Sequence, residues 1–507
     1  MHTRTSELQE AGQQLTQSAA ALADYIRAQA DEGRAAHEVE KSIWEWVLQL
    51  GRRALEHFFA CAGDGDVGEE MQLPDGRTVR RLGARHVREY RSVFGVVSFG
   101  RAVYGSREGQ RIEYVPLDAR LHLPQGKFSY LLQDWDQFLV VEEPYAGVSD
   151  RLHRILGFAQ SVDSLERMNR KTAALVPEFF DFLPAPAPEH EGKIVVASAD
   201  GKGVPMRRLV EQAPIESHRP KRGPQPNTKK MALLGTVYTV DPLQRTPQDV
   251  VASLFRDPKQ PVNGEQPARP KPQHKRVRAS LARSDAGTTQ PAGDEIFGWM
   301  AREVDARDPA GTKPLCVLMD GQESHWRAAQ QHLRGDNVTE VLDLLHVTPR
   351  IWSAAYLFHP ENSRAAVEFV KDRVLRILQG KVSSVTASLR WMGEYRGLSA
   401  SKREQLGKIC DYLDKNRERM RYDEYLRAGY PIATGVIEGA CRHLVKDRLE
   451  RAGMRWVLEG AQSMLHLRSV HLSGLWDEFT AYRIQRENER LYPHAVKGQE
   501  RQWAMAA

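Results

Sequence analysis

The sequence predicts an α/β core that carries an all-α insertion and is preceded by three smaller modules. Two apolar runs, Ile194–Ala199 and Leu315–Met319, each lead into an aspartate, as buried strands often do, and they alternate with helical segments. Helical periodicity dominates 351–430, whereas short β-prone runs fill 63–125. The 507 residues suffice for two to four domains of about 150 residues each. A hydrophobic content of 41% and a charged content of 27% are typical of a folded chain.

The first two modules differ in texture. Residues 1–62 are predicted to be helical, because leucine, isoleucine and valine recur there at helical spacing. Residues 63–125 form a small β-rich module, marked by the run Val93–Phe99 and the turn Pro74–Gly76. Its arginines can lie along a phosphate backbone or form a solvated charged face, and the sequence leaves both open. They are Arg77, Arg80, Arg81, Arg85, Arg88 and Arg91.

The third module, 126–183, has the pattern of a helix-turn-helix. Three amphipathic segments lie within 128–176, and Ser149 and Ser161 are the expected N-caps of the second and third. The last helix carries cationic side chains suited to phosphates, although any amphipathic helical hairpin can present such residues. The candidates for DNA binding on this helix are Arg167, Arg170 and Lys171.

A proline-rich linker at 184–188 precedes the first part of the core, 190–350. Strands are expected at 193–200, 231–240, 315–319 and 341–347, with a further strand starting at 204. The strands up to 240 suggest an antiparallel meander. Two basic segments, 219–230 and 258–278, interrupt it and are expected to be loops.

The rest of the chain is predicted to be helical. Residues 351–430 form the all-α insertion, and 431–507 complete the core with one helix and then continue as C-terminal helices. The first of these helices presents Glu438, Arg442 and Lys446 at i, i+4 and i+8, which places all three on one broad face. Arg442 and Lys446 are therefore candidates to contact a nucleic-acid backbone beside Glu438.

The candidate chemical site combines Asp200, Asp320 and Glu438. Two strand-end aspartates and one helical glutamate can converge at the edge of a sheet, and three such carboxylates call for a cation. Oxygen ligands suit Mg²⁺ or Mn²⁺, and two such ions roughly 3.5 to 4 Å apart support phosphodiester chemistry. A strand that ends in Asp-Gly is also a common turn, so each residue alone is weak. The combination with basic segments and a helix-turn-helix favours the chemical site.

Composition excludes several other classes. No apolar run approaches the roughly 20 residues of a membrane span, and the N-terminus lacks a hydrophobic signal core, so we expect a cytoplasmic protein with no membrane partner. The four cysteines contain no Cys-x-x-Cys pair, which argues against a disulfide framework. The net charge of +6 is mild for this length, so only local clusters of cations indicate a polyanionic partner.

Four motifs resemble those of bacterial insertion-sequence transposases of the ISKra group. They are Ala199–Val204, Met319–Gly321, Asp343–His346 and Gly435–Arg442, and they occur in the order found in that family, with a long helical insertion before the last. The group is related to Mutator-like DDE transposases. The resemblance spans about 70–475 and implies an RNase H-like core. It assigns Asp200, Asp320 and Glu438 as the catalytic and metal-binding triad.

The same resemblance implies accessory and partner features. Asp343 and His346 match the accessory C/D-x-x-H motif of the superfamily. Asp343 is also a competing choice for the second catalytic carboxylate; Asp320 is preferred because Asp343 has apolar residues on both sides. His346 is equally well explained as a core histidine. Similar sequences often hold a cysteine pair near 104–108, which this chain lacks, so zinc is not expected.

The expected function is therefore that of a DDE transposase which binds terminal inverted repeats, cleaves DNA with two Mg²⁺ ions and joins the ends to target DNA. The partner is double-stranded DNA, and a homodimer or larger assembly at the bacterial nucleoid is expected because two ends must be handled together. Two alternatives remain: an RNase H-like nuclease without strand transfer, and a catalytically silent DNA-binding protein derived from a transposase. Strand joining separates the first from a transposase.

Overall fold

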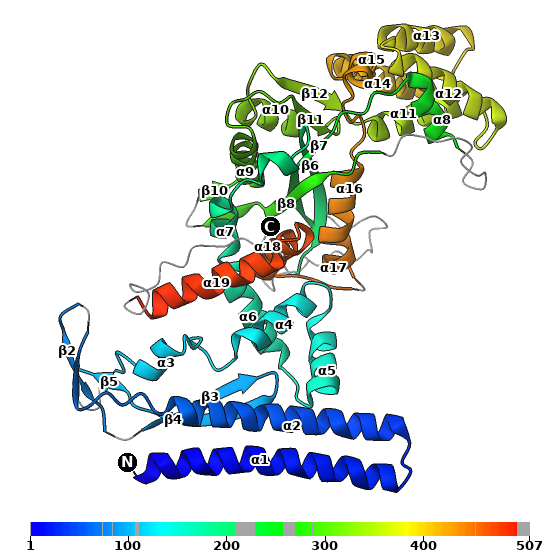
Figure 1. The fold of residues 1–507 in the computed structure, drawn as a ribbon. Coiled ribbons are helices and arrows are strands. Elements are labelled where there is room, and N and C mark those ends of the chain that lie inside the picture. The colour runs from blue at the N-terminus through cyan, green and yellow to red at the C-terminus, as the bar shows by residue number, and fades with distance from the viewer. Residues whose placement is uncertain are drawn as a thin grey trace, which may run out of the picture. The chain divides into compact units, whose positions relative to one another are not determined.

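The chain folds into two compact units. The computed structural model describes residues 2–73, 75–83, 85–106, 111–207, 229–256, 269–285, 288–451 and 453–493. Unit 1 consists of Met1–Thr172 together with Asp477–Ala507, and unit 2 consists of Ala173–Trp476. Both are mixtures of helices and strands, drawn as ribbons in Figure 1.

Unit 1 begins with two long antiparallel helices, α1 (His2–Asp31) and α2 (Ala36–Ala62), as the helical periodicity predicted. The second helix packs against the predicted β-rich module, where Phe59 stacks on Phe99 with ring centroids 3.9 Å apart. The module holds a three-stranded and a two-stranded antiparallel sheet. Their strands are β1 (Glu70–Gln72), β2 (Thr78–Arg81), β5 (Tyr104–Gly105), β3 (His86–Ser92) and β4 (Gly95–Arg101).

Helices complete unit 1. The three predicted at 128–176 are present, with Ser161 capping the third through the Ser164 amide, whereas Ser149 is wrong as a cap because it lies inside the second helix. Pro144 precedes that helix instead and supplies the break. The C-terminal helix belongs to this unit and contacts the first of the three through Arg483 and Gln133, 2.9 Å apart. The helices are α3 (Pro116–Arg120), α4 (Tyr130–Val140), α5 (Tyr145–Leu156), α6 (Val162–Ala173) and α19 (Trp476–Leu491).

The centre of unit 2 is a five-stranded mixed sheet of order β12-β11-β6-β7-β8 (Figure 1). The strand β6 pairs antiparallel with β7 and parallel with β11, which pairs parallel with β12. The predicted meander is wrong in its second strand, because β6 continues unbroken to Pro205; the antiparallel meander that is present consists of β6, β7 and β8. The strands are β6 (Ile194–Pro205), β7 (Lys229–Val240), β8 (Gln273–Leu281), β11 (Leu315–Met319) and β12 (Val338–Leu342). A separate hairpin joins β9 (Arg283–Asp285) to β10 (Thr288–Gln290).

Helices cover the sheet and its open edge. Gly235 of β7 allows the helix α9 (Ala292–Arg307) to approach closely, since a Cβ there would lie 2.6 Å from Ile296. Along the edge strand β8 lies the helix α18 (Leu458–Leu472). Its Gln462 side chain accepts from the Leu281 N–H and donates to the Ala279 carbonyl. This side chain satisfies edge groups that would otherwise be free to pair with another strand. Also present are α7 (Val176–Phe182), η1 (Pro188–His190), α8 (Pro247–Leu254) and α10 (Glu323–His332).

The expected helical insertion is present, and it begins earlier than predicted. The apolar run 341–347 is not one strand: β12 ends at Leu342, and a helix starts at Leu344 because Asp343 caps it by accepting from the Leu345 N–H. The insertion comprises α11 (Leu344–Phe358), α12 (Arg364–Leu378), α13 (Val382–Tyr395), α14 (Ala400–Lys415), η3 (Arg417–Arg419) and α15 (Tyr422–Ala428).

The helix that bears Glu438 contains a π-helical turn. The segment runs as α16 (Gly435–Ala440), the π-helix η4 (Cys441–Lys446) and α17 (Asp447–Leu449). The wider turn frees backbone carbonyls, and the buried Arg468 guanidinium donates to those of His443 and Leu444. The predicted helix is therefore interrupted, because Arg442 and Lys446 lie in the π turn, while Glu438, Arg442 and Lys446 are all exposed.

Candidate active site at the strand ends

Three aspartates lie at equivalent positions on three adjacent strands. Leu315 of β11 is in register with Val195 of β6 and with Val338 of β12. Five residues further along each strand direction come Asp320, Asp200 and Asp343. Because these three strands are parallel, the aspartates emerge at the same edge of the sheet. The pattern of an apolar run followed by aspartate thus marks the edge of the sheet at which the parallel strands end.

Asp200 is placed within β6, and the expectation that its strand ends there is wrong. The strand continues to Pro205 because β7 pairs with it over its full length, whereas β11 pairs only with Val195–Ala197. Asp200 therefore lies just beyond the part of β6 that has neighbours on both sides. Its Oδ1 accepts from the Gly201 N–H at 2.6 Å, and its Oδ2 accepts from the Cys441 thiol at 3.3 Å.

Asp320 follows β11 directly and is held as a carboxylate. Burial alone would raise its pKa, but the nearby imidazoles of His325 and His346 and the hydrogen bond from the Gln322 N–H outweigh burial and lower it. The Gln322 amide lies 3.0 Å from Oδ1, and His325 Nδ1 lies 3.6 Å from the same oxygen. Asp320 is thus anionic at neutral pH and oriented through one oxygen.

Asp343 is fully buried and has four donors. The N–H groups of Leu345 and Thr434 donate to Oδ1 at 2.8 and 3.3 Å. The Thr434 hydroxyl donates to Oδ2, which also lies 2.9 Å from His346 Nδ1. Asp343 therefore joins the start of α11 to the residue that precedes α16. Asp320 was preferred over Asp343 as the second catalytic carboxylate because Asp343 has apolar residues on both sides. The structure removes this reason, since Asp343 follows the end of β12 despite those apolar neighbours.

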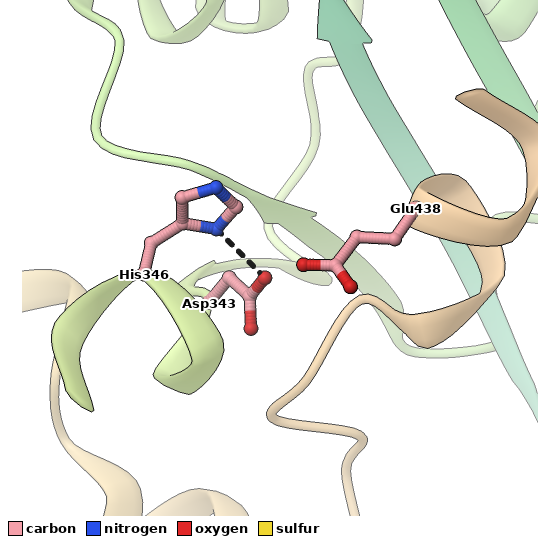
Figure 2. A group of neighbouring side chains, drawn as sticks. All are labelled: Asp343, His346 and Glu438. Carbon is pink, nitrogen blue, oxygen red and sulfur yellow. Dashed lines mark hydrogen bonds and ion pairs between the residues drawn. The ribbon is translucent and has the colours of Figure 1, made fainter. Parts of the chain in front are cut away.

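Glu438 completes the group from the other side (Figure 2). Its carboxylate points from α16 toward Asp343, while His346 extends from the first turn of α11. Ligand atoms of Asp343, His346 and Glu438 all lie within 4.8 Å of one another, so these three residues can hold a metal ion. Within the described residues they form the one such group of three or more, and Asp200 and Asp320 lie outside it.

The charges in this group shift the pKa values of His346 and Glu438. The hydrogen bond to Asp343 raises the pKa of His346 against the effect of burial, and the charges of Asp343, Asp320 and Asp200 raise it further. Burial raises the pKa of Glu438, and the charges of Asp343 and Asp200 add to this rise while His346 opposes it. The structure therefore brings Asp200, Asp320, Asp343 and Glu438 around one imidazole, which carries positive charge more readily than a free histidine.

Two further residues at this edge come from the helical insertion and had no sequence signal. The Arg350 guanidinium of α11 lies 3.5 Å from the centroid of the Tyr412 ring of α14. Burial raises the pKa of Tyr412, Arg350 opposes this, and the charges of Asp320 and Asp343 add to the rise. A Cβ on Gly321, next to Asp320, would lie 2.7 Å from Tyr412 Cζ. The Asp-Gly pair is thus required by this packing as well as by the turn.

The expected DNA-binding cations are exposed but mostly paired with carboxylates. On α6, Arg167 lies 3.0 Å from Asp163, Arg170 lies 3.6 Å from Glu166, and Lys171 lies 2.7 Å from the buried Glu487. Near Glu438, Arg442 is 71% exposed with Asp447 at 3.9 Å, and Lys446 is exposed.

The arginines of the β-rich module are also engaged. Each contacts at least one carboxylate of unit 1, which favours a paired charged face over an open phosphate track. Arg88 is buried between strand and helix, where Asp118 also accepts from Arg101. The other pairs are Arg77 with Asp75 and Glu113, Arg80 with Glu70, Arg81 with Asp66, Arg85 with Asp64 and Glu7, and Arg91 with Glu89.

The two basic segments are only partly accounted for. Residues 219–228 and 258–268 lie outside the described residues. The prediction of a loop to Arg278 is wrong, because β8 starts at Gln273, and Arg276 and Arg278 are buried within it. Arg276 donates to both carboxylate oxygens of Glu303 at 2.9 Å, so its charge is neutralised inside the protein.

Within the described ranges no helix combines the length and apolar character needed to cross a bilayer. A scan against protein-family models finds no match for this chain, and no curated protein matches it either.

Proposed function

We propose that this protein is a DDE transposase with an RNase H-like core. The observation that carries the proposal is the common register of Asp200, Asp320 and Asp343 on neighbouring strands, faced by Glu438. The strand order and directions, three antiparallel strands followed by two parallel ones, agree with the arrangement expected of an RNase H-like sheet. The long helical insertion between Asp320 and Glu438 also agrees with that assignment.

Under this proposal the four carboxylates have two kinds of role. Asp343 is fully buried and accepts from four donors, two of which lie on Thr434 and one on His346, so its role is to orient these two residues. Asp320 accepts through Oδ1, and no donor contacts its Oδ2 among the residues that the structure describes. Asp200, Asp320 and Glu438 would hold two Mg²⁺ or Mn²⁺ ions, and the tighter group of Asp343, His346 and Glu438 offers another way to hold one of them. These oxygen donors suit hard cations.

The ions, when bound, supply activation of the attacking oxygen and stabilisation of the leaving one. The reaction itself is a displacement at phosphorus: a water oxygen forms the new P–O bond, and the bond to the 3′ oxygen of the element breaks to give a 3′-hydroxyl. In strand transfer this hydroxyl attacks a target phosphodiester, and the target 3′ oxygen leaves. The chain's part is to hold the carboxylates in register and to orient them through Gln322, His325 and Thr434.

The partners follow from the same proposal. Double-stranded DNA, first the terminal inverted repeats and then the target, would contact the exposed Arg442 and Lys446 near the site and Arg167, Arg170 and Lys171 of the helix-turn-helix. Handling two ends together calls for a homodimer or larger assembly, acting on the bacterial nucleoid in the cytoplasm.

The test is nicking of a labelled terminal-repeat duplex by purified protein with Mg²⁺. Asp320→Asn and Glu438→Gln should each lower the rate by 10²-fold or more, as loss of an electrostatic contribution to the transition state does, roughly, in other enzymes. Glu450→Gln is the matched control, since Glu450 forms an ion pair with Lys229 at 2.5 Å. Full activity of Glu438→Gln contradicts the assignment. Nicking without strand joining favours the nuclease, and DNA binding without nicking favours the silent DNA-binding protein.

A further inference from the structure

A cavity of about 660 Å³ lies in unit 2 beside the carboxylate group. Its walls come from the end of β7, from α8, and from the segment 429–436 that leads into α16. Leu344 and Leu345, the residues that follow Asp343, form part of the apolar lining. The cavity therefore adjoins the strand-end site but is separate from it.

Two guanidinium groups, those of Arg245 and Arg269, line this cavity. Burial lowers the pKa of Arg245, and the neighbouring charge of Arg269 lowers it further, while Asp249 opposes both. Among the described residues the printed partners of these two guanidinium groups are a carbonyl and a hydroxyl oxygen. Arg245 donates to the Tyr430 carbonyl at 3.5 Å, and Arg269 donates to the Ser253 hydroxyl at 2.6 Å.

The carboxylate whose charge acts on Arg245 is Asp249, and its hydrogen bonds are made to the helix end. Asp249 accepts from the amide and the hydroxyl of Thr246, at 2.9 and 2.7 Å, in a capping box at the start of α8. Its pKa is lowered by these hydrogen bonds, so it remains charged and bound to the helix end. Two like charges held close together at a concave surface create a site that favours an anion.

The cationic lining continues into a second cavity of about 390 Å³. The two cavities share the wall residues Pro272, Gly435 and Val436, so they are adjacent along α16, and we call the pair of cavities the channel. The second contributes Lys271 and Lys275, and burial lowers the pKa of Lys275. Its wall includes Gly439 and Ala440, which directly follow Glu438 in the chain.

The charges favour an extended anion over a single phosphate. Four cations line the channel, Arg245, Arg269, Lys271 and Lys275, against the aspartates Asp241 and Asp249. A strand of nucleic acid presents phosphates at regular intervals and flat bases that can lie on apolar walls. The combination of spaced cations and an apolar lining matches both parts of such a strand.

We propose that this channel, defined by Arg245, Arg269, Lys271 and Lys275, binds the phosphate groups of a single nucleic-acid strand next to the cleavage site. The inference rests on the proposed function and extends it, since it gives a separated strand a path along the helix that carries Glu438. A free nucleotide offers the same phosphate chemistry and is the other source that the test must separate.

The experiment measures binding without cleavage. Full-length protein in EDTA is titrated into a labelled single-stranded DNA of about 16 nucleotides, and the affinity is followed against salt concentration. Each phosphate contact contributes about 0.7 to the slope of log K on log salt for a single strand, so Arg245→Gln/Arg269→Gln should lower the slope by about 1.4. Arg245→Lys/Arg269→Lys keeps both charges and should keep most of the slope, which guards against an effect of misfolding.

The matched control is Lys402→Gln/Arg403→Gln, which removes two exposed cations from α14. An unchanged slope in the arginine-to-glutamine variant, or an equal fall in the control, overturns the inference. Loss of binding to a labelled deoxynucleoside triphosphate with an unchanged DNA slope also overturns it in favour of a free nucleotide. The binding assay contains EDTA and does not depend on cleavage. A failure of nicking in the separate Mg²⁺ assay would therefore count against the proposed function without changing the interpretation of the binding result.

Discussion

Asp343 shows how one buried side chain can raise the pKa of a half-buried neighbour, His346. Its two oxygens accept from two backbone amides, a hydroxyl and an imidazole, and these donors lie on both sides of the site. These bonds fix the position of both oxygens and so fix the side of the carboxylate that His346 meets. His346 is the one partner among these donors that can change its own charge. The pKa of its imidazole is therefore a measure of the interaction with Asp343.

The first prediction concerns His346 in metal-free protein. Its raised pKa means that the folded state binds the proton more tightly than the unfolded state, so the stabilisation is complete below the ordinary imidazole pKa of about 6.5 and is lost as the pH rises through the raised value. Asp343→Asn should bring the pKa back down, as measured by NMR titration of the imidazole protons. His471, which lies outside this group in α18, provides an internal reference. The same His346 pKa in both proteins would contradict the account.

The second prediction concerns Gly321. Gly321→Ala places a methyl group in the Tyr412 ring, so either the ring or the Asp320 backbone must move, and we expect slower nicking with little change in DNA affinity. Tyr412→Ala removes the ring and should restore part of the rate in the double variant. Additive losses in a double-mutant cycle would show that the two residues do not interact.

At the residue scale, Asp200, Asp320 and Glu438 were found because each has a local signal, whereas Asp343 lies within an apolar run and was named through the resemblance. The signal is an apolar run that ends at a carboxylate, or a helix that carries one. Arg350 and Tyr412 could not be found in this way. Their relation depends on the packing of α11 against α14, which brings together residues 62 positions apart and leaves no pattern in the sequence of either helix.

Helices and strands were predicted best where a single periodicity covers the whole element. The paired helices of 1–62 and the strands β7 and β11 are examples. The prediction was wrong at β8, because its arginines and lysine read as a solvated loop, whereas Arg276 and Arg278 have acidic partners from α9. It was wrong again after β12, where Asp343 ends the strand as an N-cap, although the apolar run continues past it.

The third prediction belongs to the helix α4. Asp136 is fully buried, and burial raises its pKa to about 7 although Gln160 donates to it at 2.7 Å. A raised carboxyl pKa stabilises the fold fully below the ordinary value of 3.8, and that contribution is lost as the pH rises through about 7. Asp136→Asn should therefore gain stability relative to the wild type with rising pH, by at most about 4 kcal/mol above pH about 8.

Denaturant unfolding followed by circular dichroism across this pH range measures the gain. Asp150→Asn, an exposed position on the neighbouring helix α5, is the control and should show no such trend. A stability difference that does not vary with pH would mean that Asp136 does not titrate in this range.

The whole molecule is built so that unit 2 is inserted into unit 1. Residues 173–476 form one compact body, while the two flanking stretches of chain form the other. Within unit 1, α19 supplies the buried Arg483 and Glu487, which contact Gln133 and Lys171. The assignment of α19 to unit 1 could not be predicted from composition, because α19 has the same amphipathic pattern as the helices before it.

The fourth prediction follows from this division. Truncation after residue 476 removes α19 and leaves the polar partners of Arg483 and Glu487 in α4 and α6 without their contacts, so unit 1 should lose cooperative unfolding and become sensitive to protease. Truncation after residue 493 is the control and should leave it intact. Limited proteolysis with mass spectrometry locates the cuts. Protection of 1–172 in both proteins would show that α19 is dispensable.

The insertion also fixes an order of events during synthesis. The ribosome makes the first 172 residues of unit 1 and then the 304 residues of unit 2 before α19 appears. At roughly 5–20 residues per second this interval lasts about 15–60 s, during which the surface of α4 that receives Arg483 has no cover. Unit 2, being continuous in the chain, can fold within that interval. A nascent chain of this protein is therefore a natural client for a chaperone that shields the first unit until the last helix is released.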